Sequence, residues 1–211
     1  MEQEVRIAPV GLAGTLVLPE DFHAVVVFAH GSNRSSPRDR TVAAALQKAG
    51  FGTLLFDMLT EAEMQDRANA FDVHLQAERL VQATQFLYEH PAVDDRPIGY
   101  FGAASGSAAA LIAAARAAQH HHVRAVVSRG GRPDLAEVWL DGVAAPTLLI
   151  VGGEDHAVIE LNQQALKRLH CIKALEIVPG AGHLFEEPGA LEAVTASTTA
   201  WFTTHLSSRE A

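Results

Sequence analysis

Apolar positions along this chain gather in short, nearly continuous runs separated by longer segments of mixed polarity. The runs are rich in Val, Leu, Ile and Phe, which is typical of strands buried on both faces of a sheet. They cover residues 24–29, 52–57, 98–102, 123–128, 147–151 and 174–178. Two earlier segments, 5–10 and 14–18, predict a hairpin around Gly11.

The segments between these runs carry helical periodicity. The clearest is 72–90, where the apolar positions fall on one face of a helix and Pro91 blocks its continuation. That face consists of Val73, Ala77, Leu80, Thr84 and Leu87. Further helices are expected at 41–49, 104–119, 133–140 and 158–169, and a last amphipathic helix is marked by Leu191, Val194, Thr198 and Trp201.

This alternation of strands and helices predicts an α/β fold. We expect a three-layer α/β/α sandwich, with helices on both faces of a mostly parallel, doubly wound sheet. No repeat and no linker-like segment interrupts the pattern, so a single domain over 1–211 is expected. Ligands of such folds bind where the carboxyl ends of the strands meet, and the loops there should carry the chemistry.

The amino-acid composition excludes several classes of protein and of partner. The 211 residues are 48% hydrophobic and 19% charged, an ordinary globular mixture that excludes overall disorder. The 25 acidic residues outnumber the 16 Lys and Arg, giving a formal charge of −9. Such a surface repels phosphate backbones and anionic lipid, so neither nucleic acid nor membrane is expected as a partner.

The location of the protein is also constrained by the sequence. The lone cysteine, Cys171, allows no disulfide within the chain. The acidic start at 1–4 lacks the pattern of a signal peptide, and the apolar stretch 108–118 is too short to span a bilayer. A cytoplasmic protein is therefore expected.

Four of the loops that follow strands carry residue types used in acyl transfer. His30-Gly31-Ser32 follows the first buried run, and residues 102–106 (GAASG) follow the central one. Residues 152–155 (GGED) and 180–183 (GAGH) follow later strands. Their order along the chain is strand-to-helix elbow, acid and histidine, which is the order of the catalytic triad in α/β-hydrolases.

Several strings extend this likeness over nearly the whole chain. They are FGTLLFDMLTE at 51–61, FDVHLQAERL at 71–80, IGYFGA at 98–103, VSRGGRPDLA at 127–136 and APTLLIVGGEDHAVIELN at 145–162. With them the chain resembles α/β-hydrolases of the dienelactone-hydrolase-related group. The resemblance implies a serine-type carboxylic ester hydrolase that acts on small or exposed esters. The widest candidate for a cap domain, between Phe56 and Asp72, is short, so no sizeable cap is expected. The resemblance also implies no cofactor, no metal and a small-molecule ester as substrate, and it leaves a homo-oligomer open.

The position of the nucleophile departs from the family pattern. Gly102 and Gly106 flank Ala104 where the consensus G-x-S-x-G has serine, and a methyl group cannot attack a carbonyl. Three interpretations compete. Ala104 replaces a serine, by engineering or as a natural variant; Ser105 is the nucleophile of a shifted elbow; or the chain is a pseudoenzyme that binds a small molecule without turnover.

The remaining catalytic roles follow from the resemblance. His183 would be the general base; its alternative role is that of a polar loop residue without a part in catalysis. Asp155 would orient His183, although an Asp at this place also caps helices. The backbone N–H groups of Ser32 and Ser105 would form the oxyanion hole.

Residues near these loops are candidates for a substrate pocket. They are Gly31, Met58, Leu59, Phe71, Arg129 and Arg132. Core packing is the competing role for the apolar residues. The competing role for the arginines is a salt bridge with Asp134 or Asp57. His120–His122 fall at a predicted helix end and favour a solvated terminus over a metal site.

Overall fold

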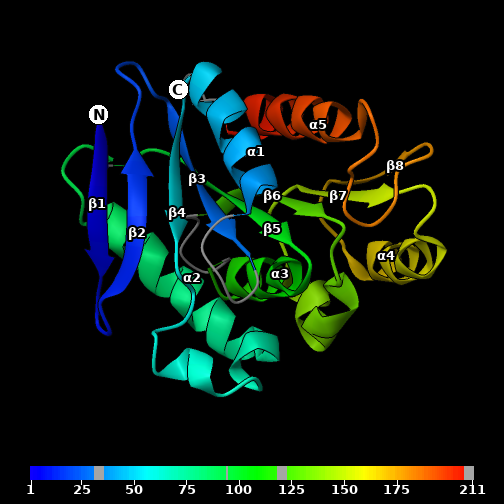
Figure 1. The fold of residues 1–211 in the computed structure, drawn as a ribbon, viewed down its shortest axis with the longest axis horizontal. Coiled ribbons are helices and arrows are strands. Elements are labelled where there is room, and N and C mark those ends of the chain that lie inside the picture. Colours follow the sequence, from blue (N-terminus) through cyan, green and yellow to red (C-terminus); the bar gives the residue numbers. More distant parts are fainter. Residues whose placement is uncertain (31–35, 94, 118–122, 207–211) are drawn as a thin grey trace.

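Eight strands form one sheet in the computed structural model, which describes residues 1–30, 36–93, 95–117 and 123–206 (Figure 1). The strands are β1 (Glu2–Ile7), β2 (Leu12–Val17), β3 (Ala24–Ala29), β4 (Phe51–Phe56), β5 (Ile98–Ala103), β6 (Val123–Arg129), β7 (Thr147–Gly152) and β8 (Lys173–Val178). They lie in the order β1-β2-β4-β3-β5-β6-β7-β8. Every strand that the apolar runs predict is present.

The direction of the strands fixes where a site can lie. In the sheet order, all neighbours from β4 through β3 to β8 are parallel, whereas β2 pairs antiparallel with β1 and with β4. Strand β3 has β4 on one side and β5 on the other, so the winding of the chain reverses between β3 and β5. The carboxyl ends of these two strands therefore border the crevice where doubly wound sheets bind ligands.

Five α-helices of the described chain cover the sheet. They are α1 (Pro37–Lys48), α2 (Val73–Tyr88), α3 (Ser105–Ala117), α4 (His156–Arg168) and α5 (Ala190–His205), joined by the 3-10 helices η1 (Glu63–Gln65), η2 (Asn69–Phe71) and η4 (Pro133–Gly142). Helices α1 and α5 pack on one face of the sheet, and α2, α3 and α4 pack on the other (Figure 1). This is the predicted three-layer arrangement. No sizeable cap domain covers the sheet within the described residues.

The helix bounds differ from the predicted ones for local reasons. Helix α1 begins earlier than expected because Ser36 and Asp39 form a capping box ahead of it, with Pro37 in the first turn. The helix predicted at 133–140 is a 3-10 helix broken at Glu137, whose φ is 46°. The predicted end of the 104–119 helix lies outside the described residues. Among the described helices, none is long and apolar enough to cross a membrane.

Candidate active site

Ala104 occupies a strained turn between β5 and α3. Its φ is 50°, in the left-handed region that residues with a Cβ rarely adopt. The residue is exposed, and α3 starts directly after it at Ser105. This is the backbone geometry of a nucleophile elbow, which holds the central side chain out at the end of the strand.

The two glycines that flank Ala104 are required by close packing. A Cβ on Gly102 would lie 2.6 Å from the Cα of Ser107, and one on Gly106 would lie 2.3 Å from the carbonyl oxygen of Ala29. Helix α3 thus crosses the ends of β3 and β5 at backbone contact. The glycine spacing in the sequence fits an elbow centred on residue 104.

Asp155 and His183 form the hydrogen-bonded pair that the sequence predicts. Nδ1 of His183 lies 2.6 Å from Oδ2 of Asp155. Because a carboxylate only accepts, Nδ1 donates, and the neutral ring then carries its acceptor at Nε2. Asp155 precedes α4, but its side chain makes no capping hydrogen bond there. Its carboxylate orients the histidine and does not cap the helix.

The loop after β6 connects the elbow to the histidine. The backbone N–H of Arg132 donates to the carbonyl of Ala104 over 3.1 Å. Two residues earlier, a Cβ on Gly130 would lie 3.2 Å from the carbonyl oxygen of His183. The side chain of His183 is 47% exposed, against 15% for Asp155. Within this pair the Asp155 side chain is mostly buried, whereas the His183 side chain is accessible to solvent.

Buried polar groups support this loop from behind, and the sequence analysis missed them. Ser107 and Ser128 are fully buried, and a Cβ on Gly131 would lie 2.2 Å from the hydroxyl oxygen of each. Nδ2 of the fully buried Asn162 donates to the carbonyl of Gly131 over 3.0 Å. The sequence signal for this packing was Gly131, because any side chain at this position would collide with both serine hydroxyls.

The two candidate arginines are paired with carboxylates of the protein. Arg132 makes two hydrogen bonds to Asp134, of 2.9 and 2.7 Å, as one of the alternatives predicted. Arg129 does not contact Asp134 or Asp57 as expected; its partner is Asp39 of α1, at 3.3 Å. Burial lowers the pKa of Arg129, opposed by the nearby Asp39 carboxylate. Arg129 thus acts as a buried link between β6 and α1.

Other pocket candidates separate into core and surface. Met58 is fully buried and Leu59 is 2% exposed, as core packing, the competing role, would have them, and their pocket role stays a prediction. Phe71 is 77% exposed at the end of η2. Gly31, Ser32 and His120–His122 lie outside the described residues. Within the described residues no group of three or more His, Cys, Asp and Glu could hold a metal ion.

The segment between β4 and α2 is held by an ion pair between Glu63 and Arg79. Arg79 of α2 donates to Oε1 of Glu63, while Oε2 accepts from the backbone N–H of Thr60 over 2.8 Å. Burial works to raise the pKa of Glu63, but the Thr60 hydrogen bonds and the Arg79 charge outweigh it and hold that pKa below its usual value. The segment that carries Phe71 is therefore held against the body of the protein.

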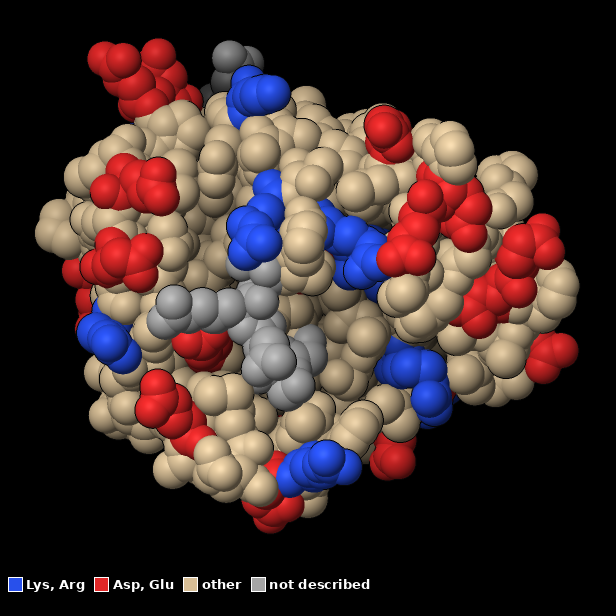
Figure 2. Space-filling model, viewed as in Figure 1, with Lys and Arg blue, Asp and Glu red and all other residues tan. Residues whose placement is uncertain are grey.

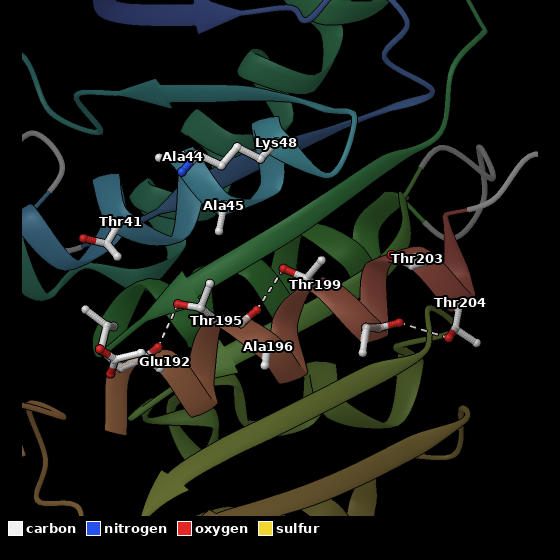
Figure 3. A pocket seen from close by; sticks show the side chains of 12 residues that line it. Thr41, Ala44, Ala45, Lys48, Glu192, Thr195, Ala196, Thr199, Thr203 and Thr204 are labelled. Atoms are coloured by element: carbon white, nitrogen blue, oxygen red, sulfur yellow. Dashed lines mark hydrogen bonds between the residues drawn. The ribbon is translucent and has the colours of Figure 1, made fainter. Parts of the chain in front are cut away.

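A groove of about 1030 Å³ lies apart from these residues, between α1 and α5 (Figure 3). Several of its threonine hydroxyls donate to carbonyls of their own helices, for example Thr41 to Pro37 over 3.0 Å and Thr195 to Leu191 over 2.7 Å. None of the predicted site residues lines it.

The fold and the Asp–His pair beside a strained strand-to-helix turn define an α/β-hydrolase. The chain belongs to the dienelactone hydrolase family, whose model matches residues 12–206.

Three similar proteins illustrate how far the likeness extends. A dienelactone hydrolase from Anabaena variabilis has a TM-score of 0.93 and 49% identity, over 98% of this chain and 98% of that one. The fold is shared with carboxyl esterase 2 from Tuber melanosporum. Its TM-score is 0.74 and its identity 17%, over 98% of this chain and 87% of that one. A Mycobacterium tuberculosis protein named as a phosphoribosyl transferase is 53% identical over 97% of this chain. The chain spans 46% of that relative, whose name applies to the longer protein.

Proposed function

We propose that this chain is a carboxylic ester hydrolase of the serine type whose nucleophile position holds Ala104. The observation that carries the proposal is the 2.6 Å hydrogen bond between His183 and Asp155, tied through the loop after β6 to the elbow of Ala104. In this proposal His183 is the base, Asp155 is its orienting acid, and Ala104 lacks the reacting oxygen. The chain would bind an intact ester without cleaving it.

With serine at 104, each remaining group has a defined task. The hydroxyl would attack the ester carbonyl while Nε2 of His183 takes its proton. Asp155 would stabilise the imidazolium, and the same proton would then go to the leaving alcohol. The backbone N–H of Ser105, aided by the amino end of α3, would stabilise the oxyanion, with Ser32 as the second donor. Water would release the acid from the acyl-enzyme.

Two alternatives remain from the sequence, a shifted elbow and a non-catalytic binder. Ser105 is half-buried in the first turn of α3, and within the described residues its hydroxyl makes no hydrogen bond to His183. The left-handed residue is Ala104, not Ser105. Both facts favour an elbow centred on 104.

The test installs serine at 104 and measures hydrolysis of p-nitrophenyl acetate. Because nucleophile, base and acid act as a unit, Ala104→Ser should raise kcat by up to about 10⁶. Adding His183→Ala to that variant should abolish the gain, whereas adding Ser105→Ala should preserve most of it.

Two results would contradict the proposal. A folded Ala104→Ser protein without esterase activity would leave the non-catalytic binder as the better account. Activity in the present chain that Ser105→Ala removes would establish the shifted elbow. Circular dichroism of each variant shows whether it is folded.

A further inference from the structure

The groove between α1 and α5 carries little charge. Figure 3 shows the two helices side by side along its length, with their lining side chains directed toward the space between them. Of the described residues that line the groove, Lys48 and Glu192 are the only charged ones. The others are alanines, threonines and Leu191. Since charged residues are depleted at the centre of protein interfaces, this composition suits a surface that another protein covers.

The outer side of α5 departs from the usual pattern of a surface helix. Such a helix carries charged residues on the side that faces solvent. In α5 the exposed residues beyond the first turn are instead Ala196, Ala200, Thr203 and Thr204, although 19% of the whole chain is charged. Short side chains allow a second helix to pack at a small interaxial distance. The exposed side of α5 therefore fits contact with another helix.

Four threonine hydroxyls of the groove are already bonded within their own helices. Each of Thr195, Thr199 and Thr204 donates to the carbonyl four residues earlier in α5, over 2.7, 2.9 and 3.0 Å (Figure 3). Thr41 does the same in α1, over 3.0 Å. A buried hydroxyl is costly only when it has no hydrogen bond in place of the one to water. An apolar partner can thus cover these threonines without leaving their hydroxyls unsatisfied, whereas a polar small molecule would find few free groups.

The two charges of the groove differ in sign and lie apart along it. Glu192 is in the first turn of α5, and Lys48 is in the last turn of α1. Figure 3 shows Ala196 between them along the length of the groove. A two-fold axis that crosses the groove near Ala196, perpendicular to the helices, reverses the helix direction in a second copy. That rotation brings Glu192 of each copy toward Lys48 of the other, as an isologous interface requires.

The net charge of the chain restricts where two copies can meet. At −9, each copy repels the other when their acidic surfaces approach. Figure 2 shows Asp and Glu side chains spread toward the edges of the face that it displays. The groove offers instead two pairs of opposite charge around an uncharged centre. Electrostatic complementarity of this kind selects one orientation of the partners and suppresses others.

From these observations we infer that the groove between α1 and α5 is the interface of a homodimer. The second copy is related by a two-fold axis near Ala196, and its α5 lies antiparallel to α5 of the first. Burial of the alanine and threonine methyl groups stabilises the contact, and the two pairs of Lys48 with Glu192 fix its orientation. None of the predicted site residues lines the groove, so the inference is independent of the proposed hydrolase function.

The first test measures the mass of the full chain by sedimentation equilibrium over a range of concentrations. The mass should rise from that of the monomer to that of the dimer. Ala196→Arg places like charges of the two copies together at the axis and should raise the dimer Kd about a hundredfold. Val81→Arg is the matched control, because Val81 is 40% exposed in α2 on the other face of the sheet, and it should leave the Kd unchanged.

Two results of this test would overturn the inference. One is a parent chain that stays monomeric at every concentration. The other is a dimer whose Kd does not respond to Ala196→Arg, which would place the interface on another face. Circular dichroism shows whether each variant is folded.

The second test reverses the two charges and keeps the alanines in place. Lys48→Glu and Glu192→Lys should each raise the dimer Kd about tenfold, because like charges then meet across the interface. The variant with both changes should regain most of the parent affinity, since the opposite pairs form again. Glu78→Lys, at an exposed position of α2, is the control and should leave the Kd unchanged. A double variant that dimerises no better than the single ones would refute the two-fold arrangement.

Discussion

Replacing Ala104 by glycine should stabilise the protein, which is the reverse of the usual effect of this substitution. The reason is the φ of 50° at Ala104, which forces its Cβ toward the following carbonyl oxygen. That conformation costs an L-residue about 1–2 kcal/mol and costs glycine almost nothing. Since Ala104 is exposed, removing its methyl group sacrifices little buried surface.

The opposing effect comes from the unfolded chain. Glycine is freer there than alanine, which lowers stability by about 0.4–1 kcal/mol. The difference leaves a net gain of roughly 0.5–1 kcal/mol for Ala104→Gly. The matched control is Ala44→Gly, because Ala44 is exposed in the middle of α1, where the same change should cost about 1 kcal/mol.

Urea unfolding followed by circular dichroism measures both variants against the parent. In a domain of this size each kcal/mol moves the Tm by about 2–4 °C, so thermal unfolding should show shifts of opposite sign. If Ala104→Gly destabilises the protein as much as Ala44→Gly does, the turn is not strained and the assignment of the elbow loses its main support.

Three further predictions concern the same region. Gly106→Ala should destabilise the protein by about 1–3 kcal/mol or more in urea unfolding, because the new methyl group would meet backbone atoms, whereas Gly142→Ala, with its nearest neighbour at 3.7 Å, should change stability little. In the serine-restored protein, Asp155→Asn should lower kcat by roughly 10⁴-fold with KM nearly unchanged, since the histidine loses its orienting acceptor; a small effect would argue against the triad. Because the pKa of Glu63 is lower in the folded protein than its ordinary value of 4.5, its stabilising effect is complete above that value and is lost as the pH falls through the folded pKa. Unfolding free energies should thus fall less steeply between pH 5 and about pH 3 in Glu63→Gln than in the parent, and equal slopes would contradict this.

Local patterns explain why the sheet and the pairing of Asp155 with His183 could be predicted. Strands buried on both faces leave unbroken apolar runs, and motifs such as GAASG and GAGH follow them directly. The pairing of Asp155 with His183 could be anticipated because parallel strands bring their carboxyl ends to one edge.

The features that could not be predicted from the sequence depend on contacts between residues far apart in the chain. The partner of Arg129 is Asp39, far earlier in the chain, and nothing local distinguishes it from Asp57 or Asp134. An apolar residue after a strand can turn toward the core or the surface, and Met58 turns inward. The break of η4 at Glu137, whose φ is 46°, follows no periodicity of the sequence.

The turn at Ala104 is strained and is flanked by two closely packed glycines, and its central residue carries no hydroxyl. Alanine and serine codons of the GCN and TCN sets differ by a single nucleotide. A chain that keeps this elbow and the Asp155–His183 pair therefore lies one base change from the serine form, with no other part of the turn to rebuild. In the hydrolase proposed above, loss of the hydroxyl at residue 104 would therefore be a genetically reversible state, open to selection in either direction.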